Sequence, residues 1–295
     1  MRLRLPGSEL DLQPGRPVLM GIVNASPDSF SDGGDLPTLD DQVARGLAQV
    51  TDGATIIDVG GESGVTNTPV SDAEVEAARV VPLVRGLAEA GVVVSVDTWK
   101  PIVADQALAA GASIINDVSG LRDPALAEVC AARGGALVVM HTRAAPKVKE
   151  FPRYDDVRAD VLAFLQERLA VARSAGLDDD QLVIDPGPDF AKTPAQTVEV
   201  LRHLDDLQRL ERPILLAVSR KDFVGALTLT APQDRDAGTL AAIGDGVDRG
   251  ATILRVHDVA GTARFLRVRA ALRGELDVAD DLTLPEHLRR RRPTS

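Results

Sequence analysis

Short apolar runs recur along the chain and alternate with longer stretches of helical periodicity. Most of the runs are nearly continuous rather than alternating, which indicates strands buried on both faces of a parallel sheet. The pattern predicts eight strands, at residues 18–24, 55–59, 92–97, 113–117, 137–141, 182–185, 214–219 and 253–257. Because helical segments separate the strands, the chain is expected to consist of repeated βα units.

Local signals mark where several of the intervening helices begin. Ser71 followed by Glu74 has the form of a capping box that opens a helix over residues 72–90. Pro101 stands in the expected first turn of the next helix, and Thr193 is the expected cap of a later one. These signals support helices of ordinary length between the strands.

Four glycine–alanine pairs stand directly before predicted strands and form a weak internal repeat. Their glycines are expected to close the preceding helix in the left-handed conformation, and the alanines permit a tight turn into the strand. The glycines are Gly53, Gly111, Gly135 and Gly250. Eight βα units in 295 residues favour an α/β fold with a single (β/α)₈ TIM barrel. An open doubly wound sheet is the alternative, but the Gly-x-Gly-x-x-Gly turn typical of it is missing after the first strand.

No Pro/Gly/Ser-rich linker divides the chain. The expected organisation is therefore a single barrel domain at residues 16–275, preceded by an N-terminal extension (residues 1–15) and followed by a C-terminal tail (residues 276–295). The basic cluster at residues 289–292 is interpreted as a solvated part of that tail.

Composition narrows the class of protein. Hydrophobic residues make up 44% of the chain and aromatic residues only 3%, so Ala, Val, Leu and Ile must fill a substantial core. The formal net charge of −11 argues against a general nucleic-acid binder. The single cysteine, Cys130, is expected to be a small core residue on a helix and fits a reducing compartment. With no apparent signal peptide or membrane span, a soluble cytoplasmic protein is expected.

Polar side chains gather where the predicted strands end. In a TIM barrel all of these ends lie on one face, where active sites are built. In chain order the residues are Asn24, Asp58, Glu62, Asp97, Asn116, Asp117, His141, Asp185, Ser219, Arg220, Lys221, Arg255, His257 and Asp258. Taken singly, Asp58 and Asp117 are each expected to cap the following loop, and His141 to be structural. The agreement of eight strand ends predicts one small-molecule site.

The chemistry of this set suits a flat heterocycle with a guanidine-like edge, because a carboxylate accepts two parallel N–H bonds from such an edge. The groups suited to it are those of Asp97, Asn116, Asp185 and Lys221. Arg255 can stack on an aromatic ring or pair with a phosphate, and Asn24 and His257 are suitable partners for a diphosphate or its Mg²⁺. Neither zinc-ligand spacing nor a Ser–His–Asp arrangement is present. The set therefore favours positioning and charge stabilisation over a covalent intermediate.

The segments around these strand ends resemble the signatures of the dihydropteroate synthases, the pterin-binding barrels of folate biosynthesis. The first loop reads MGIVNASPDSFSDGG at residues 20–34, close to the opening signature of that family. Further matches are IDVGGES at 57–63, SVDT at 95–98, IND at 115–117, MH at 140–141, IDPG at 184–187, SRK at 219–221 and RVHD at 255–258. The resemblance covers roughly residues 16–273, in order and at all eight strand ends.

The resemblance implies a reaction and a role for each matching residue. Such enzymes join 6-hydroxymethyl-7,8-dihydropterin diphosphate to para-aminobenzoate and release diphosphate with the help of Mg²⁺. The implied substrate-binding residues are Asn24, Asp97, Asn116, Met140, Asp185, Phe190, Ser219, Lys221, Arg255 and His257, of which Asp97, Asp185, Lys221, Arg255 and His257 form the implied catalytic set.

The resemblance implies that different residues of this set bind the pterin diphosphate and the para-aminobenzoate. Asp97, Asn116, Asp185 and Lys221 are implied to hold the pterin, with Arg255 against its ring. Asn24 is implied to contact the metal and the diphosphate, with His257 and Arg255 also on the diphosphate. Phe190, Lys221 and Ser219 are implied to flank the aminobenzoate, and Pro27 and Phe30 to belong to a closing loop. A homodimer is implied as well, with the apolar helix expected at residues 260–272 as a candidate interface.

The second-substrate half departs from the family's pattern. The family normally continues Thr-Arg-Pro-Gly after Gly-Gly-Glu-Ser, whereas residues 64–69 read GVTNTP and carry no arginine. Asp189 stands where the family tends to have glycine, and a carboxylate there is unfavourable beside the negative end of para-aminobenzoate. Trp99 and Asp222 also replace the more usual Tyr and Ser. Two alternatives stay open: a divergent paralogue that binds a pterin without this reaction or with another acceptor, and a methyltetrahydrofolate-binding methyltransferase barrel.

Overall fold

Eight parallel strands close into a barrel in the computed structural model, which describes residues 1–25, 38–62, 66 and 69–289. The strands are β3 (Val18–Asn24), β4 (Ala54–Gly60), β5 (Val93–Asp97), β6 (Ile114–Asp117), β7 (Ala136–Met140), β8 (Leu182–Asp185), β9 (Ile214–Leu216) and β10 (Ala251–Val256). They follow one another around the barrel in chain order, and β10 closes it against β3. The predicted TIM barrel is confirmed. Each predicted strand overlaps an observed one, although β9 ends at Leu216 rather than at residue 219.

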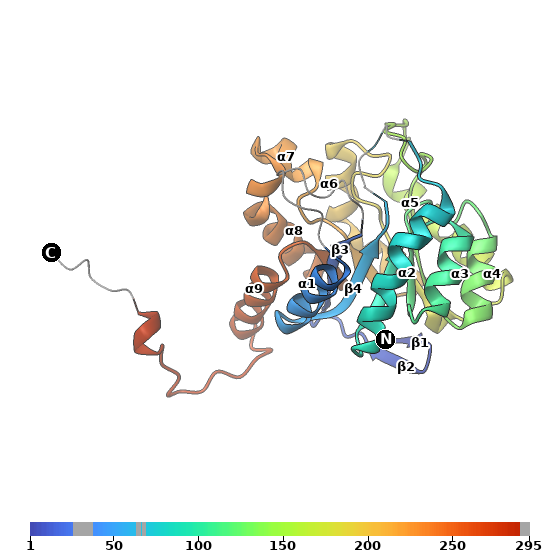
Figure 1. Ribbon diagram of the computed structural model, residues 1–295. Helices are drawn as coiled ribbons and strands as arrows, with labels where there is room; N and C mark the ends of the chain where they lie inside the picture. The colour runs from blue at the N-terminus through green and yellow to red at the C-terminus, as the bar shows by residue number, and fades with distance from the viewer. Residues whose placement is uncertain (26–37, 63–65, 67–68, 290–295) are drawn as a thin grey trace.

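Helices surround the barrel and cover the outward faces of its strands (Figure 1). They are α1 (Leu39–Thr51), α2 (Ala73–Glu89), α3 (Pro101–Ala109), α4 (Ala125–Arg133), α5 (Val157–Ser174), α6 (Pro194–Arg202), α7 (Asp222–Thr228), α8 (Asp236–Asp248) and α9 (Val259–Leu272). Short 3₁₀ helices lie at Asp179–Gln181, Leu204–Leu210, Pro232–Asp234 and Glu286–Leu288. Buried aliphatic side chains fill the layer between strands and helices, as the composition required.

The predicted helix starts are confirmed at two places and wrong at a third. Pro101 begins α3, and Thr193 caps α6 by accepting a hydrogen bond from the third residue of the helix. The predicted capping box of Ser71 and Glu74 does not form. Asp72 is the cap instead, with its carboxylate accepting the Glu74 N–H at 2.9 Å. The helix therefore begins one residue later than expected.

The glycines that precede strands adopt the left-handed conformation at three of the four predicted junctions. Their φ angles are +113° at Gly53, +111° at Gly111 and +98° at Gly250. At the junction before β7 the prediction is wrong by one residue, because Gly134 takes the left-handed position with φ +70° and Gly135 does not.

An N-terminal hairpin closes one end of the barrel, a feature that the apolar pattern did not predict. Its strands β1 (Arg2–Leu5) and β2 (Ser8–Asp11) lie beneath the barrel in Figure 1. Leu3, Leu5 and Leu12 are buried against the inward-facing apolar residues near the strand starts. Because this end is filled with aliphatic side chains, the interior offers room for polar groups at the other end, where the strands finish.

The last part of the chain leaves the barrel. Residues 277–289 are exposed and run away from the surrounding helices (Figure 1). Cys130 is buried in α4, which confirms its expected place in the core. Among the described residues there is no helix with the length and hydropathy needed to cross a membrane.

Candidate active site

A cavity of about 540 Å³ opens at the carboxyl ends of the strands, and it brings together most of the predicted site residues. Its lining includes Asp97, Phe190, Ser219, Lys221, Arg255 and His257. Asn116 and Asp185 are almost fully buried at the ends of β6 and β8, below these residues, and Met140 is buried at the end of β7. Residues from strands β5, β6, β7, β8 and β10 and from the loops after β8, β9 and β10 therefore converge on this face.

A buried carboxylate organises the floor of the cavity. Asp58 on β4 accepts a hydrogen bond from Arg255 Nε at 2.6 Å, one from Ser95 Oγ at 2.6 Å and one from Asn116 Nδ2 at 3.3 Å. The expectation that Asp58 caps the following loop is therefore wrong. Asp117 does cap its loop, by accepting N–H bonds from Ser119 and Leu121. The two aspartates differ because Asp58 points into the barrel and Asp117 into the turn after β6.

Arg255 joins two carboxylates across the barrel. Its Nε contacts Asp58, and its Nη2 donates to Asp97 Oδ2 at 3.1 Å. Burial raises the pKa of Asp97, and the charge of Arg255 opposes that rise. The guanidinium is thus fixed in place by ion pairs on one edge, while it still lines the cavity. A ligand would meet a preorganised cation beside a carboxylate.

Asp185 and Lys221 supply a second carboxylate and a second cation. Asp185 Oδ1 accepts the Gly187 N–H at 2.7 Å, and burial raises the pKa of Asp185 to about 6. Burial lowers the pKa of Lys221, whose Nζ lies 4.3 Å from the centre of the Phe190 ring. An ammonium held over an aromatic face by a cation–π contact has little freedom to move away from the cavity.

Ser219 and His257 form a polar pair on the cavity wall. Ser219 Oγ accepts the backbone N–H of His257 at 3.2 Å and lies 2.9 Å from its Nδ1. Burial, together with the charge of Arg255, lowers the pKa of His257 to about 4, so the ring is neutral at pH 7. With the serine hydroxyl donating to Nδ1, the ring proton sits on Nε2 and is free to donate to an anion.

The remaining predicted residues lie at the edges of this arrangement. Asn24 is exposed at the end of β3, next to Gly60 of the neighbouring strand. Arg220 turns away to pair with Asp236, and Asp258 caps α9. Pro27, Phe30 and most of the altered stretch 64–68 lie outside the described residues.

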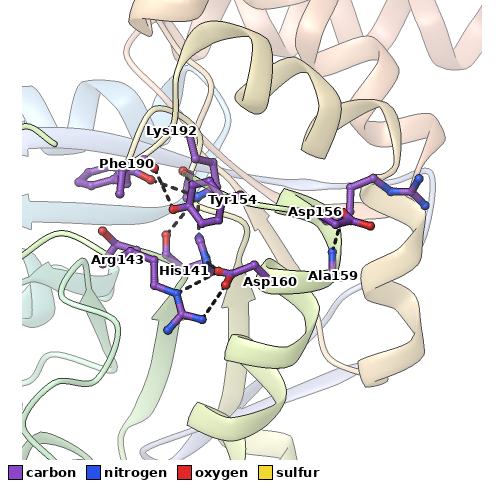
Figure 2. A network of polar contacts seen from close by, with 12 residues as sticks. His141, Arg143, Tyr154, Asp156, Ala159, Asp160, Phe190 and Lys192 are labelled. Atoms are coloured by element: carbon purple, nitrogen blue, oxygen red, sulfur yellow. Dashed lines mark hydrogen bonds and ion pairs between the residues drawn. The ribbon is translucent and has the colours of Figure 1, made fainter. Parts of the chain in front are cut away.

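A buried network behind the cavity wall was missed by the sequence reasoning. Lys192 is 1% exposed, and its Nζ contacts Nδ1 of His141 at 2.7 Å (Figure 2). His141 Nε2 in turn lies 2.9 Å from Asp160, which also pairs with Arg143. The structural interpretation of His141 is confirmed, since its ring is fully buried. The one signal for Lys192 was its place soon after a strand end, which many exposed lysines share.

Asp189 lies on the cavity wall with its carboxylate engaged on both oxygens. Oδ2 accepts the N–H of Phe223, in the first turn of α7, at 3.1 Å, and Oδ1 accepts the hydroxyl of Thr197 at 3.2 Å. A further ion cluster holds Glu62, whose carboxylate contacts Lys100 Nζ at 3.0 Å and Lys147 Nζ at 3.5 Å. Neither arrangement was predicted from the sequence.

Comparison with known proteins points to one family. The family model of pterin binding enzymes matches residues 20–257. The dihydropteroate synthase of Bacillus subtilis is 40% identical over 257 residues, covering 86% of this chain and 88% of the relative. That of Escherichia coli is 39% identical over 270 residues, covering 91% and 95%.

Solved structures of the same enzyme share the fold closely. Dihydropteroate synthase of Xanthomonas albilineans with 4-aminobenzoic acid has a TM-score of 0.85 at 42% identity, covering 92% of this chain and 99% of that one. A complex of the X. albilineans enzyme with 7,8-dihydropteroate gives a TM-score of 0.83 at 43% identity, with the same coverage.

Proposed function

The chain belongs to the dihydropteroate synthase family, whose members are transferases that form a carbon–nitrogen bond, and we propose how its cavity carries out that reaction. The substrates are 6-hydroxymethyl-7,8-dihydropterin diphosphate and para-aminobenzoate. The observation that carries the proposal is a set of two carboxylates and two cations at the base of one cavity. Asp97 pairs with the partly buried Arg255, and the buried Asp185 lies close enough to Lys221 to interact with its charge. Such a set matches the polar edge of a pterin and the charge of its diphosphate.

Asp185 and Asn116 hold the pterin in this mechanism. The Asp185 carboxylate accepts two parallel N–H bonds from the aminopyrimidine edge, which requires its ionised form. The Asp185 carboxylate also accepts the Gly187 N–H at 2.7 Å, and this bond within the protein fixes its direction before the ligand arrives. Asn116 is fixed in the same way by its bond to Asp58. Preorganised groups of this kind lower the cost of orienting the substrate.

Arg255, His257 and Asn24 act on the diphosphate. The exocyclic C–O bond breaks with its electron pair leaving on diphosphate, and the pterin stabilises the cationic methylene that remains. Arg255 balances the developing negative charge, and neutral His257 donates from Nε2. Because both groups are held by contacts already present in the structure, they need little reorganisation during the step.

Mg²⁺ fits this end of the barrel as a partner of the diphosphate. The exposed amide oxygen of Asn24 is a ligand of the kind that Mg²⁺ accepts, and no group of three or more His, Cys, Asp or Glu residues forms a metal cage in the described part of the chain. Mg²⁺ usually takes one or two protein oxygens and completes its shell with phosphate and water. When bound, Mg²⁺ would neutralise negative charge on the leaving diphosphate, and Asn24 would be the residue that holds it.

Phe190, Lys221 and Ser219 surround para-aminobenzoate. The aryl amine attacks the methylene carbon, the C–N bond forms, and the amine loses one proton. The Phe190 ring and the Lys221 ammonium, held 4.3 Å apart, give this part of the cavity a flat apolar wall and a cation for the benzoate end. No covalent bond to the protein is needed.

The proposal extends to the assembly and compartment of the enzyme. We place it in the cytoplasm as a homodimer that takes small molecules as substrates. Exposed apolar side chains on α9, with Val268 at 60% and Leu272 at 84% exposure, support an interface there. The buried free thiol of Cys130 is compatible with a reducing compartment. Light scattering after size-exclusion chromatography, repeated for Val268→Asp, tests the dimer.

A diphosphate-release assay tests the reaction. Purified protein with the pterin diphosphate and Mg²⁺ should release diphosphate at a rate that depends on para-aminobenzoate, with 7,8-dihydropteroate as product. Lys221→Ala should lose most of this activity. Tight pterin binding without any para-aminobenzoate-dependent product would instead favour a pterin-binding paralogue and contradict the proposal.

A further inference from the structure

The buried ammonium of Lys192 has no part in the proposed chemistry, yet every one of its donors is used. Its Nζ donates to the carbonyl oxygens of Gly187 at 2.9 Å and Phe190 at 3.1 Å, and to Nδ1 of His141 at 2.7 Å (Figure 2). An ammonium group has three N–H donors. Burial lowers the pKa of Lys192 to about 7. In the ammonium form these three acceptors, together with the His141 carbonyl at 3.5 Å, occupy all of its donors, so Lys192 acts through the groups that it binds.

Within the described part of the chain, no carboxylate forms a direct ion pair with Lys192. Burial lowers the pKa of His141 to about 3, so its ring is neutral and can accept at Nδ1. The carboxylate of the network, Asp160, contacts the opposite side of the ring, 2.9 Å from Nε2, and is itself paired with Arg143. Two of the three bonds from Lys192 therefore go to backbone carbonyls of one short segment, residues 187–192.

That segment needs external support. Gly187, Asp189 and Ala191 have φ angles of +64°, +65° and +52°, all in the left-handed region. For Asp189 and Ala191, which carry a β-carbon, this conformation is disfavoured and persists only where surrounding contacts fix it. One such contact is the hydroxyl of Tyr154, which donates to the Ala191 carbonyl at 2.8 Å. Thr197 and the Phe223 N–H hold Asp189, and Lys192 holds the carbonyls of Gly187 and Phe190.

We propose that Lys192 is a positioning residue for the second substrate, because its ammonium fixes the segment that presents the Phe190 ring to the Lys221 ammonium. The inference rests on the proposed function for its kinetic test, since Phe190 and Lys221 are the groups placed around para-aminobenzoate. Lys192 lies behind the wall and is not itself a lining residue of the cavity. Removal of the Lys192 charge should therefore disturb the para-aminobenzoate site more than the pterin site.

Two variants and one matched control test this role. Lys192→Met keeps the length of the side chain and removes the ammonium. Tyr154→Phe removes the single hydroxyl that donates to the Ala191 carbonyl of this segment, and it serves if Lys192→Met does not fold. Arg143→Met breaks the pair with Asp160 in the same network, but among the described residues the Arg143 side chain contacts Asp160 and the Phe164 ring rather than residues 187–192. A general loss of stability would affect all three variants alike.

The expected result is a split between kinetic constants. For Lys192→Met, the KM for para-aminobenzoate should rise about tenfold with kcat changed less than about twofold, the pattern of lost binding rather than lost transition-state stabilisation. Tyr154→Phe should show a smaller rise in the same constant, and Arg143→Met should match the wild type. An unchanged KM in Lys192→Met, or an equal rise in Arg143→Met, would overturn the inference.

Hydrogen exchange separates this inference from the proposed function. The Phe190 amide donates to the Gly187 carbonyl at 3.1 Å, within the segment that Lys192 holds. Its exchange should accelerate in Lys192→Met and not in Arg143→Met, whether or not the protein turns over. A wild-type protein without turnover would refute the proposed function alone, whereas unchanged exchange in Lys192→Met would refute the positioning role alone.

Discussion

Replacement of Asp58 by asparagine tests whether this carboxylate organises the floor of the cavity. Asp58 is fully buried and accepts hydrogen bonds from Arg255 Nε, Ser95 Oγ and Asn116 Nδ2. Asparagine has nearly the same size, but it carries no charge and replaces one acceptor oxygen by a donor. Among the described residues, the Arg255 guanidinium would then keep one ion pair, with Asp97.

The magnitude follows from the burial of the pair. Removal of one partner of a buried ion pair costs about 3–5 kcal/mol, because the other charge stays buried without compensation. Arg255 is 20% exposed and keeps its contact with Asp97 Oδ2 at 3.1 Å, which lowers the cost. We expect Asp58→Asn to reduce the free energy of unfolding by about 3 kcal/mol, at the low end of that range. The shift of the urea midpoint at constant m-value measures it.

Asp97→Asn is the matched comparison, because Asp97 contacts the same arginine. Its side chain is 24% exposed and makes one ion pair with Arg255, so the loss of unfolding free energy should be only about 1 kcal/mol. Asp97 is proposed to touch the pterin, however, and its substitution should weaken pterin affinity more than that loss suggests. A stability loss in Asp58→Asn no larger than that in Asp97→Asn would refute the reasoning.

Ionisation, backbone geometry and thiol burial lead to three more predictions. Burial raises the pKa of Asp185 to about 6 and that of Asp97 to about 7, and both carboxylates are proposed to bind the pterin in ionised form. Pterin affinity should therefore fall as the pH is lowered through this range, and Asp185→Asn should remove the part of the fall below pH 6 in calorimetric titrations. Gly187→Ala should lower the free energy of unfolding by at least about 2 kcal/mol, because the added β-carbon would collide with the His141 carbonyl at a φ of +64°. Gly134→Ala, at a φ of +70° with open space around the β-carbon, should lose only the about 1 kcal/mol that a left-handed backbone costs. Thermal unfolding of the two variants compares these losses. The Cys130 thiol, whose pKa burial raises to about 12, should resist a thiol reagent until the protein unfolds, and rapid labelling of the native protein would contradict its burial.

The barrel was predictable because its strands are buried on both faces. A doubly buried strand must be apolar almost throughout, so a run such as residues 182–185 is visible in the sequence and matches β8. The N-terminal hairpin was not predictable in this way. Its residues in contact with the core, Leu3 and Leu5, alternate with arginines over only four positions, a pattern too short to separate from a loop.

The placement of the cavity residues was predictable where a side chain lies at its own strand end, and unpredictable where it depends on a distant partner. Asp97, Lys221 and Arg255 follow or end strands and therefore share one face of any TIM barrel. Asp58 and Asp117 look equivalent in the sequence, yet only the assembled barrel brings Arg255 to Asp58. The burial of Lys192 likewise depends on acceptors from two separate loops, which no local pattern encodes.

The negative charge of Asp189 at the rim of the cavity is compensated by hydrogen bonds that the sequence alone does not reveal. An unpaired carboxylate at Asp189 would repel the negative end of para-aminobenzoate strongly in a poorly solvated pocket. In the structure its oxygens accept bonds from the Phe223 N–H and the Thr197 hydroxyl. The charge therefore faces a helix start, where a carboxylate is stabilised. Phe223 lies two residues after Lys221, so the same bond joins the Phe190 segment to the loop that carries the ammonium. Asp189 thus adds negative charge to the rim, but it also helps to hold the loop that carries Lys221, the cation proposed to meet the benzoate.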